Sequence, residues 1–302
     1  MGATATGKTD LAVEIAKRFP VELISVDSAL IYRGMDIGTA KPAAGALAIT
    51  PHHLIDIIDP AERYSAWHFV EDANCLIDEI SARGKIPLLV GGTMMYYHAL
   101  EHGLNQLPVA DSSVRASLNQ QATQIGWQAM HTKLARIDPV SASRIKPGDS
   151  QRIQRALEVF EISGLPLSSL QQHVSTGLKP ETLKIILNAH DRAGLHARID
   201  LRFMEMIENG LIDEVRLLKN RSDLDLSLPS MRCVGYRQVW QFLDGSLSRD
   251  EMTYKAIVAT RQLAKRQMTW LRKQPQEHAF NCLDYRKEAI FESINNVFSG
   301  AW

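Results

Sequence analysis

The chain has 302 residues, of which 45% are hydrophobic, and carries 34 basic and 34 acidic side chains. This size suits one large or two smaller domains, and a net charge of zero excludes a uniformly basic protein, so any nucleic-acid surface must be local. Three distant cysteines (Cys75, Cys233 and Cys282) argue against a zinc site or a disulfide framework, and without a signal peptide or a long apolar run we expect a soluble, cytosolic protein.

The stretch from Gly2 to Thr9 matches the P-loop pattern G-x-x-x-x-G-K-[ST]. Its glycines let the backbone curl so that N–H groups and a helix start converge on a phosphate. Lys8 would meet the outer phosphate, and the Thr9 hydroxyl can bind Mg²⁺. The pattern predicts a di- or triphosphate site, without specifying a nucleotide, built from Gly2, Ala3, Thr4, Ala5, Thr6, Gly7, Lys8 and Thr9.

Only Met1 precedes this loop, whereas a P-loop normally follows a buried strand. A central strand bonds to both neighbours and anchors the loop, so we expect the native gene to encode about ten more residues, four to six of them an apolar run.

Residues 21–27 predict a strand that ends at Asp27 and Ser28. Ligands gather at the carboxyl ends of parallel strands, which brings both residues beside the P-loop. Asp27 can be a magnesium ligand, a general base or a cap for the next turn. Residues 51–57 predict a second short strand, and its adjacent His52 and His53 are more typical of a loop than of a metal site because no third ligand is in view.

Residues 67–83 predict a helix, and residues 86–93 predict a buried parallel strand. At the end of this strand Gly91 and Gly92 permit a close backbone approach, and Thr93 offers a hydroxyl to a phosphate. A further helix is expected over residues 94–100.

The segment 112–172 predicts only helices, over 114–124, 127–137, 139–145 and 151–162. The fold class is therefore α/β, a P-loop NTPase-like parallel sheet flanked by helices with an inserted all-helical subdomain. We place the core at 1–109 and 179–302 and the insertion at 110–178. The arginines of the insertion, including Arg115 and Arg155, either form a partly basic face with a function or are only solvated helix charges.

Residues 183–189 return to strand, and the helix after them carries Arg202, which can fold over the P-loop because a guanidinium fork suits phosphate oxygens. The helix predicted over 251–273 carries basic, amide and aromatic side chains, among them Lys265, Arg266 and Trp270. These suit RNA backbone and bases, or else form a solvated face.

The chain resembles the bacterial type of the tRNA isopentenyltransferase (tRNA dimethylallyltransferase) family. Each motif alone is generic, but their order is specific. The matching blocks are residues 2–9, 25–32, 35–42, 90–93, 155–159, 232–238 and 260–267.

The resemblance implies transfer of a dimethylallyl group from dimethylallyl diphosphate to N6 of adenine 37 in tRNAs that read codons beginning with U. It implies a P-loop that holds pyrophosphate with Mg²⁺ bound at Thr9, a general base at Asp27, and pyrophosphate contacts from Thr93 and Arg202. It also implies contacts with tRNA through Asp27, Ser28, Ala29, Leu30, Thr93, Arg115, Gln151, Arg152, Ile153, Gln154, Arg155, Arg232, Cys233, Val234, Gly235, Tyr236 and Arg237. We expect the protein to be a monomer.

The chain departs from the family at Ala3, where proline is usual, and it lacks the zinc-finger tail of eukaryotic members. Three rival functions remain. A prenyltransferase acting on AMP or ADP would need neither the basic helix nor the insertion, a small-molecule kinase would consume ATP, and a P-loop RNA-binding protein would bind RNA without forming product.

Overall fold

A computed structural model describes residues 1–105, 107–171 and 182–299 and divides the chain into two compact units. One comprises Met1–Ala99 and Lys179–Trp302, and the other is Leu100–Leu178. The first boundary therefore falls inside helix α4 (Met94–His102), ten residues before residue 110.

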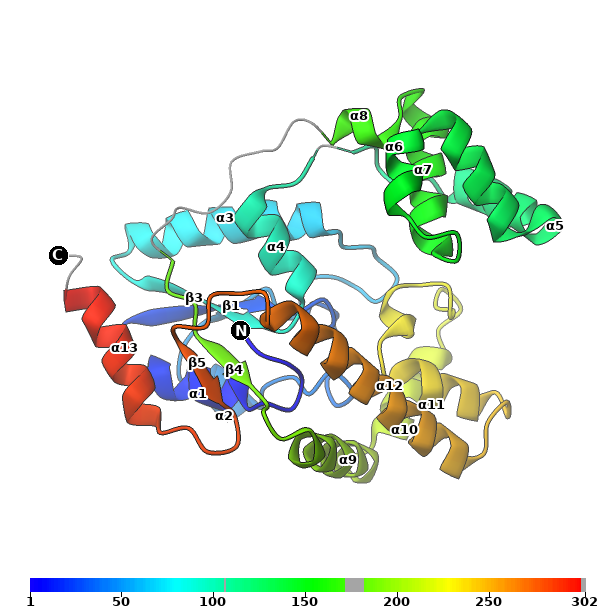
Figure 1. The fold of residues 1–302 in the computed structure, drawn as a ribbon. Coiled ribbons are helices and arrows are strands. Elements are labelled where there is room, and N and C mark those ends of the chain that lie inside the picture. Colours follow the sequence, from blue (N-terminus) through cyan, green and yellow to red (C-terminus); the bar gives the residue numbers. More distant parts are fainter. Residues whose placement is uncertain (106, 172–181, 300–302) are drawn as a thin grey trace. The chain divides into compact units, whose positions relative to one another are not determined.

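The first unit is built on a parallel sheet with the order β2-β1-β3. Its strands are β1 (Val21–Val26), β2 (His52–His53) and β3 (Ile86–Gly91). The register pairs Val26 with Gly91, so the carboxyl ends of β1 and β3 lie level. Helices α1 (Lys8–Ala16) and α3 (Ala66–Ala82) cover opposite faces of this sheet (Figure 1).

A second pair of parallel strands, β4 (Ile186–Asn188) and β5 (Ala279–Asn281), lies beside the N-terminal residues. The Leu187 amide donates to the Met1 carbonyl at 2.9 Å, and Gly2 forms a parallel bridge with Leu187. On the other side, a Cβ at Gly92 would lie 3.2 Å from the Gly2 carbonyl oxygen. Met1 and Gly2 thus run between the end of β3 and β4, where the strand before a P-loop is expected.

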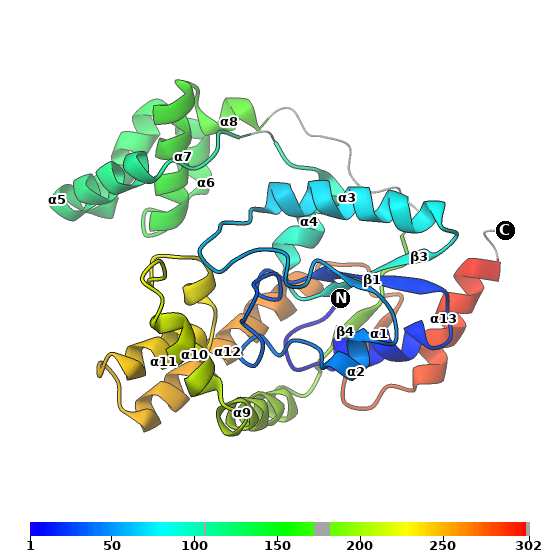
Figure 2. The same cartoon turned by 180° about the vertical axis from the view of Figure 1, so that it is seen from behind.

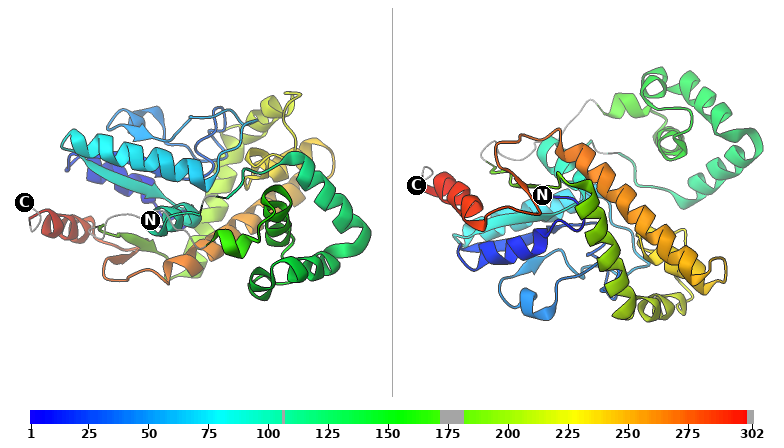
Figure 3. Two further views of the ribbon diagram at one scale, coloured as in Figure 1. Left: turned by 90° about the horizontal axis from the view of Figure 1, so that it is seen from above. Right: turned by 60° about the horizontal axis from the view of Figure 1, so that its bottom comes forward.

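A group of helices continues the first unit and packs on its own apolar core (Figure 2). It consists of α9 (Arg192–Glu208), α10 (Leu211–Lys219), the 3₁₀ turn η1 (Ser230–Arg232), α11 (Tyr236–Leu243) and α12 (Arg249–Leu271). Figure 3 shows α9 and α12 side by side. The short α2 (Ala44–Leu47), β5, α10, α11 and α13 (Lys287–Ser299) were not predicted from the sequence. Helix α13 adds Ile290, Phe291 and Ile294 to the core below the sheet.

The second unit is all-helical over its described residues, as predicted. It contains α5 (Ser112–Ile137), α6 (Pro139–Arg144), α7 (Ser150–Ser163) and α8 (Leu167–Leu170) around a core of its own. Gly126 has φ 80° and ψ 156°, which breaks α5 into the two helices expected on either side of it. Among the described residues of either unit, no helix has the length and apolarity to cross a membrane.

Candidate active site

The P-loop closes onto its own stem. Ala5 and Gly7 take left-handed φ values of 62° and 80°, and α1 begins directly at Lys8. The Lys8 ammonium and the Thr6 hydroxyl both donate to the Ala3 carbonyl, at 2.7 and 2.8 Å. Gly2, Ala3 and Thr6 do not line a cavity, whereas the rest of the loop borders one.

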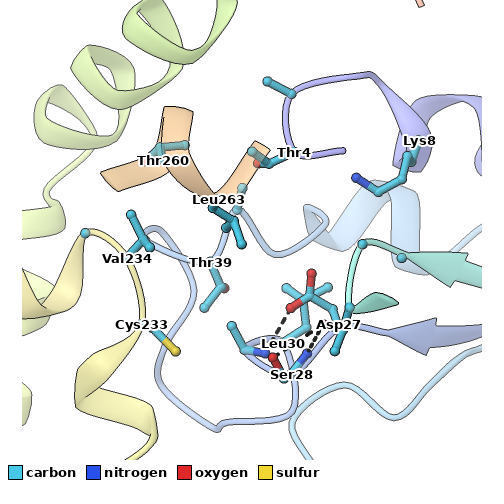
Figure 4. Close-up of a pocket in the computed structure, with 18 of the residues that line it drawn as sticks. Thr4, Lys8, Asp27, Ser28, Leu30, Thr39, Cys233, Val234, Thr260 and Leu263 are labelled. Carbon is cyan, nitrogen blue, oxygen red and sulfur yellow. Dashed lines mark hydrogen bonds between the residues drawn. The ribbon is translucent and has the colours of Figure 1, made fainter. Parts of the chain in front are cut away.

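That cavity has a volume of about 1190 Å³ and lies wholly within the first unit. Typical small-molecule sites occupy about 300–1,000 Å³, so it has room for two ligands. Figure 4 shows Lys8 and Asp27 on one side of the space and Thr39, Val234, Thr260 and Leu263 on the other. The site residues expected from the sequence that line it are Thr4, Ala5, Gly7, Lys8, Thr9, Asp27, Ser28, Ala29, Leu30, Thr93, Arg202, Arg232, Cys233, Val234 and Gly235.

The carboxyl ends of β1 and β3 bring Asp27, Ser28 and Thr93 together. The Thr93 hydroxyl accepts from the Ser28 amide at 3.0 Å and donates to the Ser28 hydroxyl at 3.3 Å. One carboxylate oxygen of Asp27 accepts from the Ala29 amide at 2.9 Å, which is the capping role considered for it. Its other oxygen points into the open cavity (Figure 4).

The phosphate end of the cavity is cationic and poorly solvated. Burial lowers the pKa of Lys8 to about 8; Asp27 opposes this shift, and Arg202 adds to it. Burial also lowers the pKa of Arg202, against the attraction of Asp27 and Asp10. Burial disfavours the charged forms of both side chains, and a polyanionic ligand stabilises those forms. The site therefore favours a polyanion.

Arg198 was not among the predicted site residues, yet it borders the cavity one turn before Arg202. A Cβ at Gly7 would lie 3.6 Å from its guanidinium, which also donates to the Cys282 carbonyl at 3.3 Å. The spacing of four residues from Arg202 on one helix was the available signal, because such residues share a face.

Gln267 was also not among the predicted site residues, although it lies in the matching block 260–267. It is only 9% exposed, accepts from the Thr4 amide at 2.9 Å and donates to the Gly92 carbonyl at 2.8 Å. It therefore ties the P-loop to the end of β3 instead of offering its amide to RNA. A glutamine on the same stripe as buried Ala264 and Leu271 was the clue.

The structure corrects two of the expected tRNA contacts. Ile153 and Tyr236 are fully buried, with 0% of either residue exposed. Neither can touch RNA in this structure, because each is a core residue of its helix. Arg237 is exposed but does not line the cavity.

In the second unit, the arginines expected to meet tRNA also serve a buried carboxylate. Glu158 is 0% exposed and accepts from Arg115 at 2.8 and 3.1 Å and from Arg155 at 2.8 Å. Burial alone would raise the pKa of Glu158, but these hydrogen bonds outweigh it and lower the pKa. Gln154 donates to Asn119 at 2.8 Å, whereas Gln151 and Arg152 are exposed.

No group of three or more His, Cys, Asp or Glu side chains is placed to hold a metal within residues 1–105, 107–171 and 182–299. His52 contacts the Thr50 carbonyl at 2.8 Å, and His53 contacts Glu22 at 2.8 Å, so both serve β2 and its neighbours. Thr9, in contrast, borders the cavity next to Asp10.

Residues 30–274 match the family described as IPP transferase. The chain belongs to this family. It is similar to the tRNA dimethylallyltransferase of Janthinobacterium sp. (strain Marseille), with 56% identity over 94% of this chain and 91% of the relative. It is also similar to the tRNA dimethylallyltransferase of Ralstonia pickettii (strain 12J), with 54% identity over 94% of this chain and 89% of the relative.

Solved structures of tRNA-modifying transferases share the fold. The full-length tRNA isopentenylpyrophosphate transferase of Bacillus halodurans is 38% identical, with a TM-score of 0.70 over 99% of this chain and 94% of that one. A eukaryotic dimethylallyltransferase acting on tRNA is 25% identical, with a TM-score of 0.80 over 99% of this chain and 78% of that one. The predicted P-loop NTPase-like fold class is therefore confirmed.

Proposed function

We propose that the chain transfers a dimethylallyl group from dimethylallyl diphosphate to N6 of adenine 37 in tRNAs that read codons beginning with U, releasing pyrophosphate. The observation that carries the proposal is that the Asp27 carboxylate lines the same cavity as the cations of Lys8 and Arg202. An anion site and a proton acceptor share one space there, as this reaction requires. Relatives above 50% identity bear the name of this activity.

The nucleophile in this reaction is a weak one. The lone pair of an exocyclic adenine nitrogen is delocalised into the ring and becomes available only as an N6 proton leaves. The Asp27 oxygen that faces the cavity accepts that proton, while the Ala29 amide holds the other oxygen. General-base assistance of this kind contributes about 10²–10⁴ in rate.

The leaving pyrophosphate lies against the P-loop. Amides of Ala5 and Gly7 and the dipole of α1 meet its oxygens, with the cations of Lys8 and Arg202 beside them. As the carbon–oxygen bond breaks, negative charge grows on the diphosphate, and a fixed guanidinium stabilises the transition state more than the ground state. Thr93 keeps Ser28 in place next to this centre.

Magnesium fits the phosphate end. The Thr9 hydroxyl is a hard oxygen donor at the start of α1, and Mg²⁺ in phosphate sites takes most of its ligands from the substrate and water. Thr9 would hold the ion, whose contribution is to neutralise diphosphate charge. This role of the ion does not change the assignment of Asp27 as the residue that accepts the N6 proton.

The proposal includes a cytoplasmic monomer with tRNA as acceptor. A prenyltransferase for AMP or ADP is the second candidate, because its diphosphate and base would occupy the same cavity. Incubation with dimethylallyl diphosphate and unmodified tRNA, followed by mass analysis of the anticodon loop, tests the proposal. Prenylated AMP without prenylated tRNA would overturn it, and consumption of ATP would indicate a kinase.

The Asp27→Asn variant tests the base. It keeps the shape but replaces an acceptor with a donor, so we expect single-turnover transfer to fall about 10²–10⁴-fold with substrate binding little changed. Asp78→Asn, at an exposed carboxylate of α3, is the matched control. Recovery of the rate at high Mg²⁺ would instead make Asp27 a metal ligand through water.

A further inference from the structure

The loop of residues 36–43 lies between two cavities. Its residues Ala40, Lys41, Pro42 and Ala43 border the main cavity and also a second cavity of about 660 Å³. Its Ile37 packs on the apolar core of the helical group, and Lys41 forms ion pairs with Asp36 and Asp56. Where the loop has open space on both sides, its position depends mainly on such polar contacts.

Glu214, on α10, holds one end of this loop. One of its carboxylate oxygens accepts from the amides of Asp36 and Ile37 at 2.8 and 2.7 Å. The other accepts from the amide of Gly38 at 3.2 Å. Hydrogen bonds to a charged acceptor are about twice as strong as neutral ones, so three converging amides form a firm anchor.

The same carboxylate binds the opposite wall of the main cavity. The buried Tyr236 hydroxyl donates to Glu214 at 2.5 Å, and Tyr236 directly follows the cavity-lining residues Cys233, Val234 and Gly235. A Cβ at Gly38 would lie 2.4 Å from the Tyr236 ring and 2.8 Å from Leu211. The ring therefore packs directly on the loop backbone that Glu214 holds, as only glycine at 38 permits.

We infer that Glu214 and Tyr236 are positioning residues that set the spacing between the 36–43 loop and the 233–235 segment at the part of the cavity that receives the acceptor base. The inference rests on the proposed function. Thr39 from the loop and Val234 from the segment flank the open space, with Lys8 across it (Figure 4). Neither Glu214 nor Tyr236 lines the cavity, so each acts through these neighbours.

The inference makes separate predictions for the two substrates. The anchor lies away from the P-loop, so dimethylallyl diphosphate affinity should stay within about twofold of wild type. The rate constant at saturating RNA should fall, since a misplaced acceptor lowers the fraction of productive geometries. A purely structural defect would behave differently: it would reduce the amount of active enzyme and hence the product amplitude, and leave the rate constant unchanged.

Single-turnover transfer to an unmodified anticodon stem-loop tests this in the full chain. Glu214→Gln turns an acceptor into a donor that faces amides, and we expect a loss of roughly 10- to 100-fold in rate constant. Tyr236→Phe removes only the hydroxyl and should cost about 3- to 10-fold. The double variant should lose less than the product of the two, because both changes break one network. Asp213→Asn and Tyr254→Phe, at side chains exposed on α10 and α12, are the controls.

Amide hydrogen exchange provides a readout that needs no activity. A peptide containing Asp36, Ile37 and Gly38 should exchange faster in Glu214→Gln than in Asp213→Asn. Unchanged exchange, unchanged rate constants with reduced amplitude, or multiplicative effects would each overturn the inference. If wild type prenylates no RNA, the proposed function fails, and the exchange measurement alone decides whether Glu214 holds the loop.

Discussion

Replacing Gln267 by methionine tests whether the P-loop depends on its tie to β3. The change keeps the length of the side chain and removes both polar ends, leaving the Thr4 amide and the Gly92 carbonyl without their partner. A buried polar group that loses its partner costs about 1–3 kcal/mol. Two such groups give an expected loss of about 2–6 kcal/mol in the free energy of unfolding, a fall of roughly 5–20 °C in Tm.

Thermal unfolding and calorimetric titration with dimethylallyl diphosphate measure the two consequences. We expect the diphosphate affinity to fall about tenfold, because Thr4 belongs to the phosphate loop and its freed amide no longer has a fixed direction. Gln262→Met, at an exposed glutamine on the same helix, is the control. If Gln267→Met unfolded within about 0.5 kcal/mol of this control, as surface substitutions do, the tie would be irrelevant to stability and the reasoning refuted.

Three further predictions concern charge. Diphosphate affinity should fall as pH rises through about 8, because the Lys8 ammonium is the binding form and burial lowers its pKa to about 8; Asp27→Asn should move this fall to lower pH, and titration at pH 6–10 measures both. Replacing exposed Lys265 and Arg266 by alanine should weaken tRNA binding and flatten its salt dependence, while Lys17→Ala and Lys287→Ala should not; an unchanged salt slope would make α12 a solvated face. Hydrogen bonds from Arg83 and His53 hold the pKa of Glu22 at about 2, so its contribution to stability is present above about pH 4.5 and is lost as pH falls toward 2; Glu22→Gln should flatten unfolding curves in that range.

Local patterns predicted most of the elements around the cavity. Strand β3 is a continuous apolar run that ends at Gly91, and β1 is a mainly apolar, β-rich run that ends just before Asp27, so both were recognisable in the sequence. The break at Gly126 was visible as punctuation because glycine alone takes that conformation without strain. In contrast, β5 is only three residues long, and it depends on pairing with β4, over 90 residues away.

The candidate site was predictable where one short motif specifies the chemistry, and unpredictable where distant residues share it. The P-loop is local, so its cavity-facing members follow from the pattern. The family resemblance assigned Tyr236 to tRNA contact, but its ring is buried and its hydroxyl donates to Glu214, 22 residues earlier. Arg115 and Arg155 likewise meet at Glu158, a residue that no spacing rule connects with both.

Asp27 brings the alternatives considered for it into one arrangement. A carboxylate at the end of a strand can cap the next turn, bind metal or accept a proton, and these roles differ in which oxygens they use. Here the Ala29 amide occupies one oxygen, which fixes the rotation of the carboxylate, and the second faces the cavity. Capping is therefore what aims the second oxygen, and it reduces the freedom that a base must lose in the transition state. A base with both oxygens in solvent would have to be oriented in every turnover. The turn after β1 does this in advance, so the residue proposed to take the N6 proton is also the one that shapes the turn.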